Sequence, residues 1–215
     1  MYEGIYAPPT AARYLLAARS ADRAYPVSSR HLIRWIRKGL AHPDLADVPG
    51  RNLTIAFQDL VSMRVIAALR AAGVSWPRIH AAEAWLRQQT GCQRPFATEQ
   101  LWTDQSDVLT DFGERLIAAS QHGQLAMSIL KAYLIPVSGL HFQDQVASKW
   151  SPQPGVMLDP SVQFGEPCIQ NTRIPTRAVS SLVHGGDPPD LVARSYGITP
   201  EELTAALHWE NKIAV

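Results

Sequence analysis

Apolar residues recur every three to four positions along several stretches of the chain, a spacing typical of helices with one face in a core. The first stretch predicts a helix that begins near Thr10, after two prolines. Two further helices are expected at about 57–72 and 76–89, separated by a glycine stop. A short alternating run at 53–55 follows a Pro-Gly turn and predicts one strand of a small hairpin.

Another helix, capped by Ser28 or Ser29, is expected between the first helix and the hairpin and should end at a glycine. Its apolar residues Leu32, Trp35 and Ile36 share one face, which we expect to point into a core. The other faces carry Arg30, His31, Arg34, Arg37 and Lys38. A helix of these dimensions fits the DNA major groove, where arginines reach phosphates or guanine edges.

A helix-turn-helix followed by a hairpin is a winged helix, whose basic tip usually touches the sugar-phosphate backbone. Arg51 and Asn52 lie near the predicted tip. The predicted DNA-binding residues are therefore Ser29, Arg30, His31, Arg34, Arg37, Lys38, Arg51 and Asn52. The alternative is a solvated basic face with no nucleic-acid partner.

The order of these elements resembles the winged helix of MerR-type regulators. The similarity runs over residues 5 to about 90 and rests on a W-x-x-x-G-L pattern in SSRHLIRWIRKGL, then the wing, then LRAAGVSWPRI. It implies DNA binding. The segment RSADRAYPV is longer than the tight turn of that family, and the family's long coiled coil with its cysteine metal sensor is missing, so effector sensing is not implied.

Residues 95–152 are expected to form a compact α+β connector. PFATEQLWTDQSDVLTDF predicts two short strands around a turn at 104–107, QLAMSILKAYL a helix, and VSGLHF with ASKWSP a second strand pair. The seven histidines show no ligand spacing, so we predict no metal site and no cofactor.

Residues 153–215 predict a helical module. Helices are expected to begin with a cap at Thr176, at Asp187 with Pro188, and at a capping box of Thr199 and Glu202. The middle fits a helix-turn-helix, with a close crossing at Ala193, a turn at Gly197, and buried Ile198, Leu203 and Ala206. The last helix carries Glu201, Glu202 and Glu210 against Lys212. A phosphate-lined groove repels that balance, which favours a protein partner.

The loop before these helices, FGEPCIQNTRIPT, combines rigid prolines with the lone Cys168. A nucleophilic cysteine needs a base, and the nearest histidine is His184, across a helix. We therefore predict a structural or partner-binding loop, with Arg173 and Arg177 as partner-binding residues and no catalytic residue. The alternative is an RNA-processing or hydrolytic enzyme that uses Cys168, Asp159 and a distant histidine.

GEPCIQNTRIPT, followed by a helix, G-D, a second helix, Y-G-I-T-P-E-E and A-L, resembles the domain of unknown function called DUF433 over residues 157–210. Such domains resemble VapB-type antitoxins, which are commonly encoded beside a PIN-domain ribonuclease toxin, and longer members place a MerR-like winged helix in front. The motif positions carried over are Gly165, Pro167, Thr172, Arg173, Ile174 and Pro175, none known as catalytic.

Charge divides the chain into two unequal halves. Residues 1–94 hold 13 Lys or Arg against 6 Asp or Glu, and residues 95–215 hold 7 against 13, so balances of +7 and −6 are hidden in a net charge of +1. The basic half is expected to meet a polyanion. Two isolated cysteines, no long apolar run and no signal-like N-terminus favour the cytoplasm and no membrane contact.

Together these features predict a mainly α fold with small β elements: a MerR-like winged helix (1–94), an α+β connector (95–152) and a DUF433-like helical domain (153–215). The predicted function is a DNA-binding, homodimeric, non-enzymatic antitoxin of a type II toxin-antitoxin pair that neutralises a PIN-domain ribonuclease toxin and autoregulates its operator. A stand-alone MerR-like regulator without a toxin is the alternative.

Overall fold

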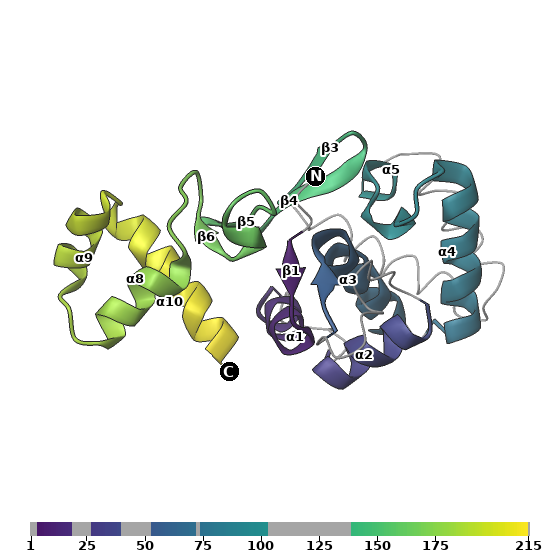
Figure 1. Cartoon of the computed structure of the whole chain (residues 1–215), viewed down its shortest axis with the longest axis horizontal. Helices are drawn as coiled ribbons and strands as arrows, with labels where there is room; N and C mark the ends of the chain where they lie inside the picture. The colour runs from purple at the N-terminus through teal and green to yellow at the C-terminus, as the bar shows by residue number, and fades with distance from the viewer. Residues whose placement is uncertain (1–3, 19–26, 40–52, 72–73, 103–138, 215) are drawn as a thin grey trace.

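The computed structural model describes residues 4–18, 27–39, 53–71, 74–102 and 139–214, which form a mixed α/β structure with two antiparallel sheets (Figure 1). The elements before residue 103 are β1 (Ile5–Tyr6), α1 (Pro8–Ala17), α2 (Ser29–Arg37), β2 (Ile55–Ala56), α3 (Phe57–Ala71), α4 (Trp76–Thr90), η1 (Pro95–Ala97) and α5 (Glu99–Trp102). Those after residue 138 are β3 (Leu140–Gln143), β4 (Val146–Gln153), β5 (Val156–Leu158), η2 (Gln163–Gly165), β6 (Cys168–Ile169), α8 (Thr176–His184), α9 (Pro189–Tyr196) and α10 (Pro200–Ala214). None of the helices in these ranges is long and apolar enough to cross a membrane.

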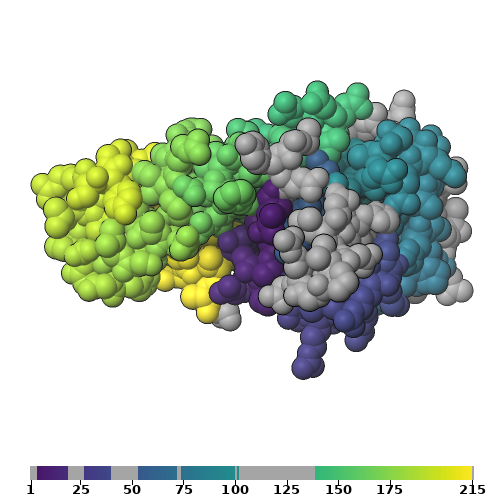
Figure 2. All heavy atoms as spheres, viewed as in Figure 1, coloured from purple at the N-terminus to yellow at the C-terminus, as the bar shows by residue number. Residues whose placement is uncertain are grey.

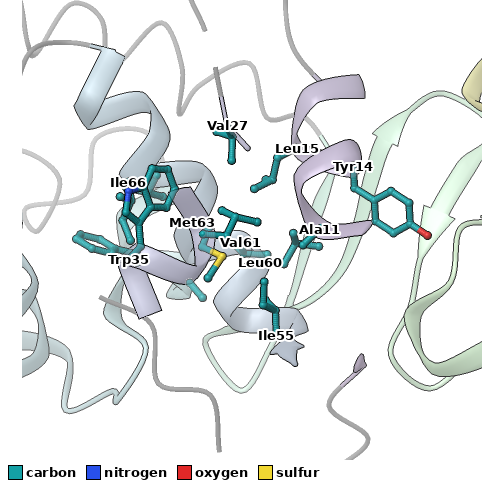
Figure 3. Close-up of a cluster of buried hydrophobic side chains, with 14 of the residues drawn as sticks. Ala11, Tyr14, Leu15, Val27, Trp35, Ile55, Leu60, Val61, Met63 and Ile66 are labelled. Atoms are coloured by element: carbon teal, nitrogen blue, oxygen red, sulfur yellow. The ribbon is translucent and has the colours of Figure 1, made fainter. Parts of the chain in front are cut away.

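The predicted helices of the basic half are confirmed, and α1 to α4 surround a common core (Figure 3). Its fully buried side chains include Leu32, Trp35, Leu60, Met63 and Ile66. The first helix begins at Pro8, earlier than the expected Thr10. Proline suits the first helical turn because its fixed φ matches the helix and the amide hydrogen that it lacks would have no partner there.

The strand expected near 53–55 is present as β2, and its described partner is the N-terminal strand β1. Ile5 pairs with Ala56 and Tyr6 with Ile55. The predicted turn of the hairpin, with Arg51 and Asn52, lies outside the described residues. The winged helix therefore stays a prediction, while the helices that would carry it are in place.

Strands were the wrong expectation for the start of the connector, where η1 and α5 are helical. Pro95 opens the first turn, and the Thr98 hydroxyl donates to the Pro95 carbonyl at 2.8 Å. The amide of Glu99 donates to the Gln145 carbonyl at 2.8 Å, which ties this turn to the β3–β4 hairpin. The expected turn at 104–107 and the helix in QLAMSILKAYL lie outside the described residues.

The strand pair expected in VSGLHF and ASKWSP is confirmed as β3 and β4, within a sheet of order β3-β4-β5-β6. Strands β5 and β6 were not predicted, because they are only 3 and 2 residues long. Since β4 pairs with β5, the sheet crosses the boundary expected between residues 152 and 153.

Helices α8, α9 and α10 enclose a second core of Ile169, Val179, Val192, Ala193, Ile198, Leu203 and Ala206. Gly197 makes the left-handed turn between α9 and α10, as predicted. The capping box is also confirmed: the Thr199 amide donates to Glu202 Oε2 at 2.8 Å, and the Glu202 amide donates to Thr199 Oγ1 at 3.2 Å.

Two helix starts differ from the expectation. Thr176 is the first residue of α8 and does not cap it, because its hydroxyl is engaged with the Pro167 carbonyl and the Glu210 carboxylate instead. Helix α9 begins at Pro189, after Pro188. Both helices thus start one or two residues from the expected position.

The C-terminal helices are joined to the start of the chain. Trp209 of α10 is fully buried in the main core, with its ring 5.9 Å from that of Tyr14 on α1. In Figure 1 the C-terminal end of α10 lies beside α1. The Tyr6 hydroxyl donates to the Gly165 carbonyl at 2.9 Å in a buried contact. The last helix therefore completes the core of the first domain.

Candidate functional site

Helix α2 is capped at its N-terminus and packed on the core through residues of its own sequence. The Ser28 hydroxyl accepts from the His31 amide at 3.4 Å, and His31 Nδ1 accepts from the Ser28 amide at 3.3 Å, which closes a capping box. Leu32 and Trp35 are fully buried and Ile36 nearly so. The helix thus has one fixed orientation on the core.

The opposite face of α2 is cationic and exposed. Arg30, Arg34 and Arg37 are all exposed. Their spacing of four and then three residues places them in one row on the helix, about 10 Å long at 1.5 Å per residue. The helix contains no acidic residue that would neutralise the row. Figure 2 shows α2 at the lower surface of the molecule, with side chains projecting into solvent.

The other residues predicted for DNA binding divide into three groups. Ser29 and His31 are half-buried, and the His31 ring is committed to the cap and lies 6.4 Å from the Trp35 ring. Lys38 is exposed, with its Nζ 5.3 Å from the centre of the Trp76 ring. Arg51 and Asn52 lie outside the described residues. The structure therefore places Arg30, Arg34 and Arg37 on the exposed face of α2, with Lys38 directly after its last residue.

Trp76, the first residue of α4, packs against α2. The Trp35 and Trp76 rings lie 5.8 Å apart, and the Arg70 guanidinium lies 4.8 Å from the Trp76 ring. Arg70 also donates to the Val74 carbonyl at 2.6 Å. Trp76 is thus flanked by two cations and the buried Trp35, which links the basic helix to the next two helices.

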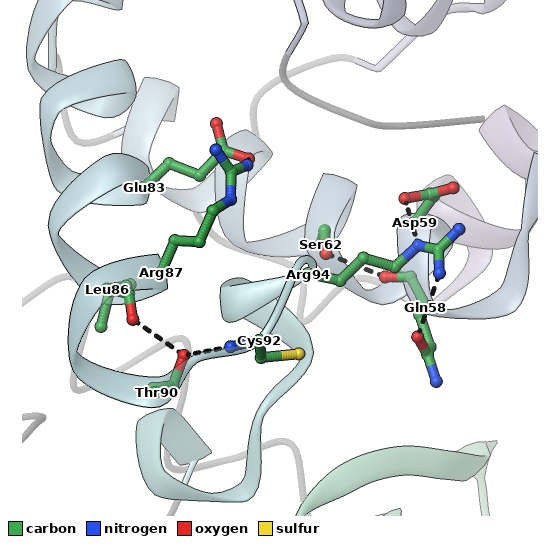
Figure 4. A network of polar contacts seen from close by, with 9 residues as sticks. All are labelled: Gln58, Asp59, Ser62, Glu83, Leu86, Arg87, Thr90, Cys92 and Arg94. Atoms are coloured by element: carbon green, nitrogen blue, oxygen red, sulfur yellow. Dashed lines mark hydrogen bonds and ion pairs between the residues drawn. The ribbon is translucent and has the colours of Figure 1, made fainter. Parts of the chain in front are cut away.

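Polar contacts stabilise α3, α4 and the segment between α4 and η1 (Figure 4). Arg94 Nε donates to Asp59 Oδ1 at 3.0 Å, and Arg87 pairs with Glu83 at 3.0 Å. Burial raises the pKa of Glu83, although the Arg87 charge opposes that shift. The Arg94–Asp59 pair thus ties the segment before η1 to α3, while the Arg87–Glu83 pair lies within α4.

The proline-rich loop separates the two arginines predicted to bind a partner. The Arg177 guanidinium forms an ion pair with Glu166, so it is engaged within the chain. Arg173 is exposed, on a turn whose Thr172 hydroxyl donates to the Ile169 carbonyl at 2.8 Å. Arg173 is therefore better placed for a partner than Arg177.

Cys168 does not have the environment of an activated nucleophile. The side chain is buried, and burial, with the nearby Glu166 and Asp159 charges, raises the pKa of its thiol to about 11. A thiol with this pKa is protonated at neutral pH, whereas nucleophilic cysteines are thiolates. His184 bonds within α8, to Ser180.

Sequence reasoning missed Tyr6, Tyr14 and Trp209, which join the two ends of the chain, and Lys149, whose Nζ lies 2.7 Å from Asp159 Oδ2. No local pattern marks them, because their partners are distant in sequence: Tyr6 and Gly165 are separated by 159 residues. The sequence marked Gly165 only as one position of the DUF433 motif.

Comparison with known proteins identifies the C-terminal part. Residues 156–209 match the family described as "Protein of unknown function (DUF433)". These residues are similar to DUF433 domains, and we call them the DUF433 domain below. Its first strand is β5 and its last residues lie in α10, so the domain includes both the proline-rich loop and the helix that completes the main core.

Two similarities extend beyond the DUF433 domain. The chain is 27% identical over 187 residues to a Mycobacterium tuberculosis protein named "Putative antitoxin VapB45", in an alignment that covers 78% of this chain and 74% of the relative. It also resembles the crystal structure of Rv2018 from Mycobacterium tuberculosis, with a TM-score of 0.72, 27% identity and coverage of 94% of this chain and 96% of that chain. The chain is thus similar to a protein named as a putative antitoxin, and its fold resembles that of a solved structure over most of its length.

Proposed function

We propose that this chain is the antitoxin of a type II toxin-antitoxin pair, which binds its operator DNA through α2 and a PIN-domain ribonuclease toxin through its DUF433 domain. The observation that carries the DNA-binding part is the exposed row of Arg30, Arg34 and Arg37 on a helix anchored by Trp35. The similarity to a protein named as an antitoxin supports the toxin partner. We place the pair in the cytoplasm.

The physical case for DNA rests on the geometry of α2. A capped helix with one buried face and a cationic row on the other presents arginines at a spacing that fits the major groove. One such helix makes few contacts, so we propose a homodimer that reads two half-sites and uses both rows together. In this role it would repress transcription of its own operon.

The case for a protein partner at the other end rests on charge. In α10 the exposed Glu201 and the half-buried Glu202 occupy the first turn, where a DNA-reading helix would meet the phosphates. The DUF433 domain therefore suits a protein surface better than a nucleic acid.

The DNA-binding part is tested by fluorescence anisotropy with the DNA upstream of the gene, measured across a salt series. The wild type should bind tightly with a steep salt slope, and Arg34→Ala/Arg37→Ala should bind more weakly with a slope reduced by about two, since each lost phosphate contact removes about one. Arg194→Ala, which removes an exposed arginine of α9, is the matched control. Equal binding by the wild type and the double variant would remove α2 from the interface.

The toxin part is tested by co-expression with the product of the adjacent reading frame, followed by co-purification and a ribonuclease assay. An antitoxin should form a stable complex and suppress the activity. DNA binding with no such partner would instead identify the stand-alone regulator.

A further inference from the structure

Phe164 is exposed to solvent, and its backbone has a conformation that is unfavourable for any residue except glycine. Three consecutive residues, Gln163, Phe164 and Gly165, have φ values of 48°, 56° and 85°, and the Phe164 side chain is 68% exposed. A side chain other than glycine rarely adopts this left-handed conformation, and strained residues of this kind cluster at functional positions. The Tyr6 hydroxyl, bonded to the Gly165 carbonyl at 2.9 Å, fixes the loop to β1.

Arg173 lies on an adjacent turn that is equally fixed. The Ile169 amide donates to the Ile174 carbonyl at 2.9 Å and closes the turn. Gln163 Nε2 donates to the Arg173 carbonyl at 3.4 Å, which connects this turn to the loop that carries Phe164. The aromatic ring and the guanidinium therefore project from two loops that are joined to each other, so little backbone freedom is lost when a partner binds.

Arg173 differs from the charged residues near it, which form ion pairs. Asp159 is paired with Lys149, and Glu166 is paired with Arg177. The Arg173 guanidinium has no ion pair with the residues that the structure describes. Beside it is a cavity of about 290 Å³, lined by Lys149, Met157, Asp159, Cys168, Thr172 and Arg173 among others. The cavity walls thus carry two cations and one carboxylate, a surplus of one positive charge.

We propose that Phe164, Arg173 and the cavity beside Arg173 form a docking site for an acidic segment of the partner protein, and this proposal rests on the toxin-antitoxin function above. An aspartate or glutamate side chain enters the cavity and pairs with Arg173 and Lys149, while an apolar neighbour packs on Phe164. A guanidinium can hold a carboxylate through two parallel hydrogen bonds.

The same charges argue against a nucleic-acid strand here. The cavity offers a surplus of one cation, which matches a single carboxylate better than a chain of phosphates. Aromatic and arginine side chains are typical of the residues that dominate binding between proteins. Arg177 takes no part in this site, because Glu166 engages it.

The test uses the full chain and the product of the adjacent reading frame, with the dissociation constant measured by biolayer interferometry. Phe164→Gly removes the aromatic ring and relieves the backbone, so the variant should fold, and Arg173→Glu reverses the surplus charge. Each is expected to weaken the complex at least tenfold without changing operator binding. Arg173→Lys should fall between them and the wild type, because it keeps the charge and loses the paired hydrogen bonds. Arg194→Glu, an exposed charge reversal on α9, is the control and should bind as the wild type does.

Three other outcomes overturn the proposal, each in a recognisable way. If the wild type forms no complex, the toxin-antitoxin function falls and the docking site with it. If both variants bind the partner protein as tightly as the wild type does, only the docking site is wrong. If the variants lose operator binding and keep the protein complex, the site contacts nucleic acid.

Discussion

Gly165 shows how a single missing atom can join two parts of a chain. A Cβ at this position would lie 2.1 Å from the Tyr6 hydroxyl oxygen, in a buried contact between the DUF433 loop and β1. The backbone is also left-handed, at φ 85°. The glycine of the loop motif is thus explained by the close approach of Tyr6.

Gly165→Ala should therefore be destabilised by more than the usual cost of a left-handed alanine, which is about 1–2 kcal/mol. Gly197→Ala is the matched control, because Gly197 has φ 65° and no atom within 4 Å of its Cβ position. Urea unfolding should show a clearly larger loss of free energy for Gly165→Ala than for Gly197→Ala. Equal losses would mean that the loop moves away from Tyr6 at no cost.

Asp159 is expected to make stability depend on pH. Burial alone would raise its pKa, but bonds from Lys149 at 2.7 Å and from the Ser161 hydroxyl at 2.6 Å outweigh burial and lower it. The unfolded chain then binds the proton more readily, so this stabilisation is present above the unfolded pKa of about 3.9 and is lost as the pH falls through the folded value.

Asp159→Asn should accordingly be less stable than the wild type at pH 7, with the difference shrinking as the pH falls below about 4. The measurement is the free energy of unfolding in urea at a series of pH values from 7 to 3. Curves that stay parallel over this range would show that another group causes the acid sensitivity. Asp190→Asn, an exposed carboxylate on α9, is the control and should follow the wild type.

At the scale of elements, the sequence predicted what depends on local signals. Helix α2 has its cap, its buried Leu32 and Trp35 and its exposed arginines where the spacing placed them. It did not predict β5 and β6, which are too short to show a period; β5 pairs with β4 on one side and with β6 on the other. The helical start of the connector was misread because Phe96, Thr98 and Trp102 are residue types that are common in strands, whereas Pro95 opens a helical turn and Glu99 bonds to Gln145.

The capping box of α10 gives a prediction at this scale. Thr199→Ala removes the oxygen that accepts from the Glu202 amide at 3.2 Å and should cost about 1 kcal/mol. Thr204→Ala is the control, since the Thr204 hydroxyl bonds only to the Pro200 carbonyl within the helix, and its loss should change stability little. Hydrogen exchange should show faster opening of the first turn of α10 in Thr199→Ala alone. Equal protection in both variants would assign the helix start to Pro200 instead.

At the scale of the whole molecule, an acidic residue of the second half interacts with a basic residue of the first half. The Glu210 carboxylate of α10 accepts a hydrogen bond from the Thr176 hydroxyl. The charges of Arg177 and of Arg13 on α1 act to lower its pKa. Burial raises the pKa of Glu210 despite these two cations. The sequence showed this asymmetry of charge between the two halves. We attributed it to outside partners, because no local pattern in the sequence shows that α10 lies against α1.

Trp209 tests whether the two domains fold as one unit. It is fully buried among residues of the first domain, next to Tyr14, although it belongs to the last helix. Trp209→Ala removes a large side chain from that core and should cost about 3–5 kcal/mol. Because the wild-type core contains residues from both ends of the chain, calorimetry should show one transition for the wild type and a transition at lower temperature, or two separate ones, for the variant. His208→Ala, an exposed neighbour on the same helix, should leave the transition unchanged. If Trp209→Ala kept the wild-type transition and full operator binding by α2, the DUF433 domain would be an independent appendage, and toxin binding would have no structural route to the DNA-binding helix.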